Sequence, residues 1–266
     1  MRLLCTLLST ALLIPAIHAA GLNDTGQTSC YNAVDVSAAC SAAVGGDAGT
    51  NPRQDARYGR DVQAAVGTLS KVGAGAAGFD FTKIANNGTT LPASAALGIA
   101  TTSWACTKDN VTGLIWEVKT ASGLRSSAHT YTWYSTKADN GGDSGTLGSN
   151  TCGGSLNAAP FNGRCNTQHY VTAVNANTVA LCGATDWRLP TQRELLSIVH
   201  AGADDPSIDT TYFPNTVSSW HWTASTFVSY PYYAWTVYFG HGHAFGSEKS
   251  LNLGRNYAVR LVRGGL

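Results

Sequence analysis

CGATDWRLPTQRE, residues 182–194, carries more information about the architecture than any other part of the chain. It joins a cysteine, a tryptophan of the kind that packs in a core, a proline and the start of a helix. Thr191 and Glu194 have the S/T-x-x-E spacing of a capping box, in which each side chain accepts a hydrogen bond from the backbone of the other. Apolar residues at positions 195, 196, 198 and 199 then give a short helix one apolar face, and Gly202 is placed to end it.

Residues 1–20 are predicted to be a secretory signal peptide. Arg2 supplies a positive charge, residues 3–17 are almost wholly apolar, and Ala19 and Ala20 are small residues suited to cleavage. The apolar run is shorter than the roughly 20 residues that a membrane-spanning helix needs. We therefore expect an exported protein (periplasmic, secreted or at the cell surface) with no transmembrane segment after cleavage. A retained membrane anchor is the alternative.

The cysteines predict disulfides, because loss of Cys5 with the signal peptide leaves an even set in an exported chain. Short separations favour two local pairs, and the remaining two cysteines would connect distant parts of the domain. The predicted disulfides are Cys30–Cys40, Cys152–Cys165 and Cys106–Cys182. Zinc binding is the competing interpretation, but the chain has no C-x-x-C pair.

The charge balance excludes a nucleic-acid binder held by bulk charge. The formal net charge is +1, and loss of Arg2 would bring it to 0. Only 12% of the residues are charged, and the chain has 29 glycines. This composition is typical of an exported, loop-rich domain, and we expect no nucleic-acid partner.

Residues 21–103 are predicted to be a loop-rich N-terminal extension, because Gly, Ala, Asn and Asp interrupt every apolar run. Within it, residues 59–66 have the pattern of one short helix, and residues 79–84 alternate like a strand.

Residues 104–266 are predicted to form the main domain. Helical spacing from Tyr170 to Leu181, with Asn166 or Thr167 as the cap, indicates one helix before the helix that starts at Thr191. Aromatic and β-branched residues predict strands at 112–118, 220–225, 233–239 and 257–263. Because strands and helices do not alternate, we expect an α+β fold with two short helices and a mainly antiparallel, twisted, disulfide-linked sheet.

The motifs of common enzyme classes are missing. GAGAAG at residues 73–78 matches G-x-G-x-x-G, but no helical run follows, and residues 82–108 contain no acidic residue for a ribose. The chain has no G-x-S-x-G or H-E-x-x-H motif, and the even cysteine count leaves no free thiol. We therefore expect neither an enzyme nor a cofactor.

His241 and His243 are the sharpest metal candidates, because residues two apart in a strand project from one face. His221 or Glu248 would have to supply a third ligand. The alternative, that both histidines are polar hairpin residues, is the default.

Aromatic residues concentrate between residues 218 and 256, where the interruption of an aromatic run by Pro231 indicates a loop. Tyrosines on the loops of a rigid scaffold give large contact areas at low entropic cost. Nearby basic residues would meet anionic groups. The predicted ligand-binding residues are the stacking Trp222, Tyr230, Tyr232 and Tyr233 and the polar His241, His243, Lys249 and Arg255. A glycan or a sulfated polysaccharide is the expected ligand.

Three motifs in order resemble the Legionella collagen-like protein C-terminal (Lcl C-terminal) domain family. They are DNVTGLIWEVK at 109–119, DWRLPT with the following ELL at 186–196, and VRLVRGG at 259–265. The resemblance runs from about residue 104 to the end, and LNDTG at 22–26 and YGRD at 58–61 are similar to the extension often found before this domain.

This resemblance implies a C-type-lectin-like fold, which is also found in formylglycine-generating enzymes, and the family's adhesin is associated with sulfated polysaccharides. The chain lacks the Glu-Pro-Asn or Gln-Pro-Asp calcium motif of sugar-binding C-type lectins, and no cysteine follows Cys182. The leading hypothesis is an exported, non-enzymatic ligand-binding module of an adhesin-like kind. The alternatives are an envelope protein that contacts other proteins without a small-ligand site, and an enzyme with an unrecognised site.

Overall fold

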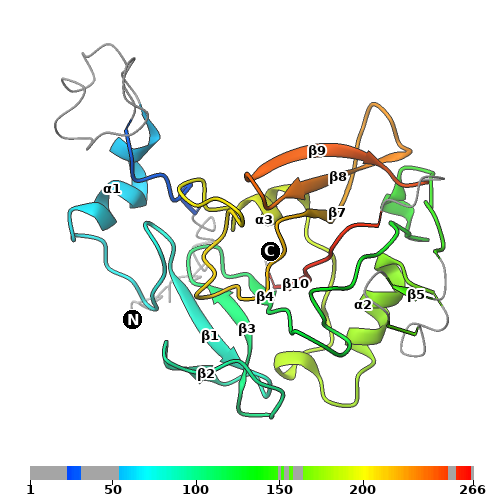
Figure 1. The fold of residues 1–266 in the computed structure, drawn as a ribbon, viewed down its shortest axis with the longest axis horizontal. Coiled ribbons are helices and arrows are strands. Elements are labelled where there is room, and N and C mark those ends of the chain that lie inside the picture. The colour runs from blue at the N-terminus through cyan, green and yellow to red at the C-terminus, as the bar shows by residue number, and fades with distance from the viewer. Residues whose placement is uncertain are drawn as a thin grey trace, which may run out of the picture.

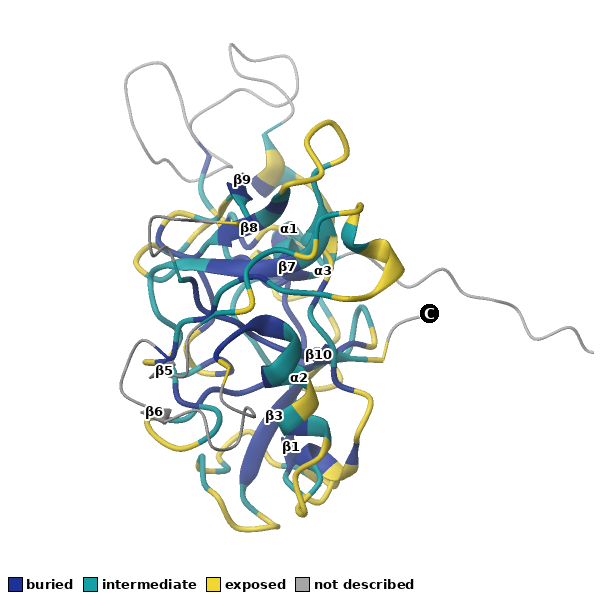
Figure 2. Ribbon diagram, turned by 90° about the vertical axis from the view of Figure 1, so that its right-hand side faces the viewer, coloured by how far each residue is buried: buried dark blue, intermediate teal, exposed yellow. Residues whose placement is uncertain are grey.

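The computed structural model describes residues 23–30, 54–148, 151–152, 156–157, 164–250 and 256–264. A five-stranded and a three-stranded sheet form the body of the molecule, and α1 (Gly59–Ala65) and α2 (Thr167–Asn175) lie at its opposite ends (Figure 1). The strands are largely buried, whereas exposed residues concentrate in the loops (Figure 2). Among the described helices, none is long and apolar enough to cross a membrane.

The five-stranded sheet has the order β10-β4-β3-β1-β2, and every neighbouring pair is antiparallel. Its strands are β1 (Phe81–Ala85), β2 (Thr90–Leu91), β3 (Trp104–Asp109), β4 (Ile115–Glu117) and β10 (Val262–Arg263). The last strand of the chain therefore returns to pair with β4. Two hydrophobic core clusters meet at this edge of the sheet. Leu261 belongs to the cluster that contains Trp187 and Trp222, and Val262 belongs to the cluster that contains Trp116 and Phe213. Because side chains alternate across a strand, both faces of this edge of the sheet are covered.

The three-stranded sheet is an antiparallel meander of β7 (Trp220–Thr226), β8 (Tyr233–Tyr238) and β9 (His243–Glu248). A short hairpin of β5 (Thr151–Cys152) and β6 (Leu156–Asn157) lies apart from it. The α+β class with mainly antiparallel sheets is thereby confirmed. Three 3-10 turns complete the described elements: η2 (Asp55–Arg57), η3 (Ala138–Asn140) and η5 (Leu181–Gly183).

Both predicted helix starts in the main domain are confirmed. Asn166 caps α2 by accepting a hydrogen bond from the His169 amide at 2.9 Å. α3 (Gln192–Leu196) begins with the capping box: the Glu194 amide donates to Thr191 Oγ1 at 3.2 Å, and the Thr191 amide donates to Glu194 Oε2 at 2.7 Å.

The predicted end of this helix is wrong. α3 stops at Leu196 with Ser197 as its C-cap, so Gly202 does not end it. The Ser197 hydroxyl donates to the Glu194 carbonyl at 2.7 Å, and Asn23 Nδ2 donates to the Ser197 carbonyl at 3.0 Å. These hydrogen bonds satisfy carbonyl groups that, in a longer helix, would accept hydrogen bonds from the amides of the next turn.

Thr191→Ala is expected to lower the free energy of unfolding by about 1 kcal/mol, because it leaves an amide at the start of α3 without its side-chain acceptor. Urea denaturation would measure this loss. Thr178→Ala is the matched control, since Thr178 is exposed and lies outside the described helices. Equal stabilities of the two variants would contradict the role assigned to the cap.

Two disulfides match the predicted pairs. Cys106–Cys182 joins β3 to η5 across 76 residues, and Cys152–Cys165 joins β5 to the segment before α2 across 13 residues. Cys30 is also disulfide-bonded, while its predicted partner Cys40 lies outside the described residues.

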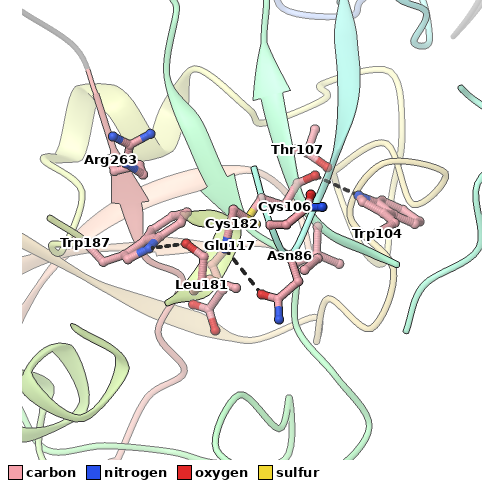
Figure 3. Close-up of a disulfide and its surroundings, with 12 residues drawn as sticks. Asn86, Trp104, Cys106, Thr107, Glu117, Leu181, Cys182, Trp187 and Arg263 are labelled. Carbon is pink, nitrogen blue, oxygen red and sulfur yellow. Dashed lines mark hydrogen bonds between the residues drawn. A yellow bond between two sulfur atoms is a disulfide. The ribbon is translucent and has the colours of Figure 1, made fainter. Parts of the chain in front are cut away.

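The Cys106–Cys182 bond lies where several segments meet (Figure 3). The Trp187 indole donates to the Leu181 carbonyl at 3.1 Å, and the Cys182 amide donates to Asn86 Oδ1 at 3.3 Å. Trp187 is buried in the adjoining core, as the sequence predicts.

The segment before residue 104 contributes to the same sheet as the main domain. The helix and the strand predicted there are confirmed as α1 and β1, and β1 pairs with β3 from Phe81 to Ala85. The domain boundary at 103/104 stays a prediction, and residues 1–20, assigned to the signal peptide, lie outside the described residues.

Candidate functional site

An aromatic hollow of about 640 Å³ lies beside the loop between β7 and β8. Its lining comprises Phe227, Tyr230, Tyr232, Tyr233, Trp235, Ala244, Phe245 and Gly246. Backbone hydrogen bonds shape the loop: the Tyr230 amide donates to the Phe227 carbonyl at 3.1 Å, and the Tyr233 amide donates to the Tyr230 carbonyl at 2.8 Å. The three tyrosines that the sequence predicts to act together are therefore brought together.

Contacts between the rings hold the hollow in shape. The Phe227 and Trp235 ring centroids are 4.7 Å apart, and those of Tyr232 and Tyr233 are 4.9 Å apart. Tyr230 connects the two pairs, with its centroid 5.9 Å from both Phe227 and Tyr232. These separations lie in the range of favourable aromatic pairs, so each ring limits the movement of the next.

Gly246 leaves room for this arrangement. It pairs with Trp235 across the β8–β9 ladder, and a Cβ atom at this position would lie 3.1 Å from Phe227 Cδ2. Such a contact is tighter than ordinary van der Waals packing. The absence of a side chain at residue 246 therefore allows Phe227 to fold over β9 and form part of the hollow.

The ring surfaces are open to solvent. The exposed fractions are 53% for Tyr230, 46% for Tyr232 and 62% for Phe245. The Tyr233 hydroxyl lies 3.4 Å from Glu248 Oε1, and partial burial together with this carboxylate raises the pKa of the hydroxyl. At neutral pH the hydroxyl is therefore a hydrogen-bond donor at the rim.

Trp222 does not belong to the site, contrary to the prediction. Its side chain is 1% exposed, and its indole donates to the Tyr131 carbonyl at 2.8 Å. The ring also lies 4.8 Å from that of Tyr257 within the core. Trp222 thus points into the interior of the molecule and cannot stack on a ligand.

Lys249 does not belong to the site either, because it is buried, with 1% of its surface exposed. Its Nζ donates to the Asn140 carbonyl at 2.6 Å and to Thr226 Oγ1 at 3.1 Å, and lies 4.1 Å from the centroid of a Trp133 ring. The lysine anchors η3 against β7 and offers no cation to a ligand. Arg255, the other predicted cation, lies outside the described residues.

His241 and His243 are exposed, but they lie at the other end of the β8–β9 hairpin. The Tyr238–His243 pair closes that end of the ladder, whereas Tyr233 pairs with Glu248 beside the hollow. His241 Nδ1 lies 2.7 Å from Asp204 Oδ1. The two histidines therefore do not join the tyrosines in one site.

The structure also fails to assemble the proposed histidine metal site. His221 is buried, and burial lowers its pKa to about 3. Glu248 lies at the far end of β9 from His243.

In the described ranges, one group of three acids comes close enough to share an ion: Asp24, Asp55 and Asp61, with ligand atoms within 4.8 Å of one another. The Asp61 carboxylate accepts hydrogen bonds from the Gly26 amide at 2.8 Å and the Gly78 amide at 2.7 Å, which gives it a structural role.

A second cleft, of about 460 Å³, lies between α2 and the start of α3. Its lining includes Lys137, Gln168, Arg188 and Glu194. The Arg188 guanidinium binds both carboxylate oxygens of Glu194, at 2.7 and 2.8 Å, so these two charges neutralise each other. The aromatic hollow is therefore the better candidate site.

Sequence reasoning did not assign five of the lining residues to the site: Phe227, Trp235, Ala244, Phe245 and Gly246. Ala244, Phe245 and Gly246 lie on β9, a strand that was not predicted, so the sequence pattern did not indicate that Phe245 lies on the surface.

A comparison with protein families matches residues 105–263 to the model described as the Lcl C-terminal domain. No curated protein and no solved structure matches the chain. The matched segment includes β7, β8 and β9, and with them the whole aromatic hollow.

Proposed function

The chain belongs to the Lcl C-terminal domain family, and from that premise we propose that it is an exported, non-enzymatic module that binds a glycan in the aromatic hollow. A C-type-lectin-like relationship of the fold is part of this proposal. The observation that carries it is the set of mutually packed, solvent-exposed rings around the hollow.

Pre-formed aromatic rings suit a sugar for two reasons. The face of a pyranose ring presents C–H groups, which pack favourably against the electron-rich face of an aromatic ring. Tyr230 and Tyr232 already contact neighbouring rings, so binding has to order few side chains.

Separate observations support the proposed export and the proposed absence of catalytic activity. The described disulfides suit an oxidising compartment outside the cytoplasm. Tyrosine hydroxyls are the only titratable groups among the residues described as lining the hollow. A hydrolytic or redox site would need a cluster of such groups.

A protein-contact role is the second candidate. Val228 is 93% exposed on the same loop, and Phe245 adds a further exposed apolar side chain. Contiguous exposed apolar surface is a feature of protein interfaces. Under this alternative the rings would pack against an envelope protein and would not bind sugars.

Tyr232→Ala is expected to weaken glycan binding about tenfold, because it removes one exposed ring from the hollow. Screening of the purified protein on a glycan array, followed by calorimetric titration of the best binder, would measure this change. Val228→Ala is the matched control: it shortens an exposed apolar side chain on the same loop that does not line the hollow. A folded protein that binds no glycan on the array would favour the protein-contact role.

A further inference from the structure

We propose that the aromatic hollow selects an uncharged glycan over a sulfated one, with Glu248 accepting hydrogen bonds from sugar hydroxyls. This inference rests on the proposed function, because it names the class of ligand for the same site. It differs from the expectation, based on sequence, of a basic face for sulfated polysaccharides.

The first step concerns positive charge. No Lys, Arg or His side chain is among the described residues that line the hollow. Lys249, the cation nearest to β9 in sequence, is buried, and its Nζ is already bound by Asn140, Asp143 and Thr226. A sulfate group would therefore leave water without gaining a charge partner from these residues.

The second step concerns the carboxylate at the rim. Glu248 pairs with Tyr233 across the ladder, and its Oε1 lies 3.4 Å from the Tyr233 hydroxyl. Among the described residues, Glu248 takes part in no salt bridge. Its negative charge would repel a sulfate held against the rings, since none of the described residues lining the hollow supplies a cation to screen it.

The third step concerns what the carboxylate can accept. An ionised carboxylate has two acceptor oxygens and no donor, so it pairs well with adjacent hydroxyl groups. Tyr233 at the rim adds a hydroxyl, and the neighbouring rings supply apolar faces. Together these groups match a neutral sugar, which combines an apolar C–H face with donor hydroxyls at its edge.

The test uses matched pairs of immobilised oligosaccharides of glucose, galactose, mannose and N-acetylglucosamine, each in unsulfated and O-sulfated form. We expect at least one unsulfated member to bind about tenfold more tightly than its sulfated partner. Because binding would not depend on cation–anion contacts, the affinity should change less than about twofold between roughly 50 and 500 mM NaCl.

Glu248→Gln separates this inference from the proposed function. Glutamine keeps the size of the side chain and removes its charge, so the preference for the unsulfated form should fall from about tenfold to about twofold, while Tyr232→Ala weakens both forms. Near-UV circular dichroism would establish that each variant is folded.

Tighter, salt-sensitive binding of the sulfated form, lost on Arg255→Ala, would overturn the charge selectivity and leave the glycan function intact. An unchanged preference in Glu248→Gln would overturn the role of the carboxylate. Silence of the folded protein on every probe would overturn both.

Discussion

Glu117→Gln is expected to lower the free energy of unfolding by about 3–5 kcal/mol, because it removes the negative charge from a buried, hydrogen-bonded ion pair. Glu117 is fully buried on β4, and its Oε1 accepts hydrogen bonds from Lys119 Nζ at 3.1 Å and from the Tyr170 hydroxyl. Its Oε2 accepts the Leu261 amide at 2.9 Å, and Arg260 Nη1 donates to the Glu117 carbonyl at 2.6 Å. One carboxylate thus connects β4, α2 and the last segment of the chain.

The electrostatic environment explains the size of this effect. Burial by itself raises the pKa of Glu117, but Lys119, Arg125 and the hydrogen bonds to the carboxylate hold it below its usual value. Burial lowers the pKa of Lys119 to about 8, and Arg260 is a second buried cation nearby. Loss of the carboxylate charge leaves both cations uncompensated. The NH2 group of a glutamine would also face one of the donors that now bind the carboxylate, namely Lys119 and Tyr170 on one oxygen or the Leu261 amide on the other.

Thermal unfolding monitored by circular dichroism would measure the loss as a fall in Tm of roughly 6–20 °C. Asp186→Asn is the matched control. It removes the negative charge from the salt bridge between Asp186 and Arg263, in which Asp186 is exposed, and should lower the free energy of unfolding by less than about 1 kcal/mol. Replacing Lys119 by Met together with Glu117→Gln should recover part of the loss. A Glu117→Gln variant as stable as Asp186→Asn would show that the buried pair does not hold these segments together.

Local chemistry explains which parts of the fold were predictable. The capping box and the Asn166 cap involve residues within one helical turn, so the spacing of Thr191 and Glu194 is sufficient to indicate them. Two disulfides were also predictable, from cysteine number and separation. The end of α3 was not, because it depends on Asn23, which lies 174 residues before Ser197.

Strands β3 and β9 were missed because their pairing partners impose them. β9 contains Ala, Gly and Ser, which have weak β-propensity, and only its ladder with β8 makes it a strand. β3 contains Lys108 and Asp109, yet it is the central strand between β4 and β1. Tertiary pairing therefore overrides local preference at both positions.

The candidate site was predictable to the extent that it is local. Pro231 within an aromatic run indicates an exposed loop, and Tyr230 and Tyr232 are indeed exposed there. Trp222 and Lys249 look equally available in the sequence, but contacts with residues roughly 90 to 110 positions earlier bury them. The sequence does not show which face of a strand a distant segment covers.

Cys106→Ala combined with Cys182→Ala is the second substitution with a large expected effect. The disulfide closes a loop of 76 residues, and the loss of that constraint on the unfolded chain predicts a fall of about 4.5 kcal/mol in the free energy of unfolding. The native contacts around the bond should persist: the Gly183 amide donates to the Asn86 carbonyl at 3.1 Å, and the Trp187 indole still reaches Leu181. The loss should therefore come mainly from greater freedom of the unfolded state.

Urea denaturation without reductant would measure this effect. Removal of Cys152–Cys165 is the matched control, because it also deletes two buried sulfur atoms but opens a loop of 13 residues, for which the same relation predicts about 3 kcal/mol. The longer loop should give the larger loss, and both variants should keep the near-UV circular dichroism of a folded protein. The reverse order with unchanged spectra would contradict the loop-closure explanation. It would show that packing around Cys165, and not restriction of the unfolded chain, is the larger source of stability.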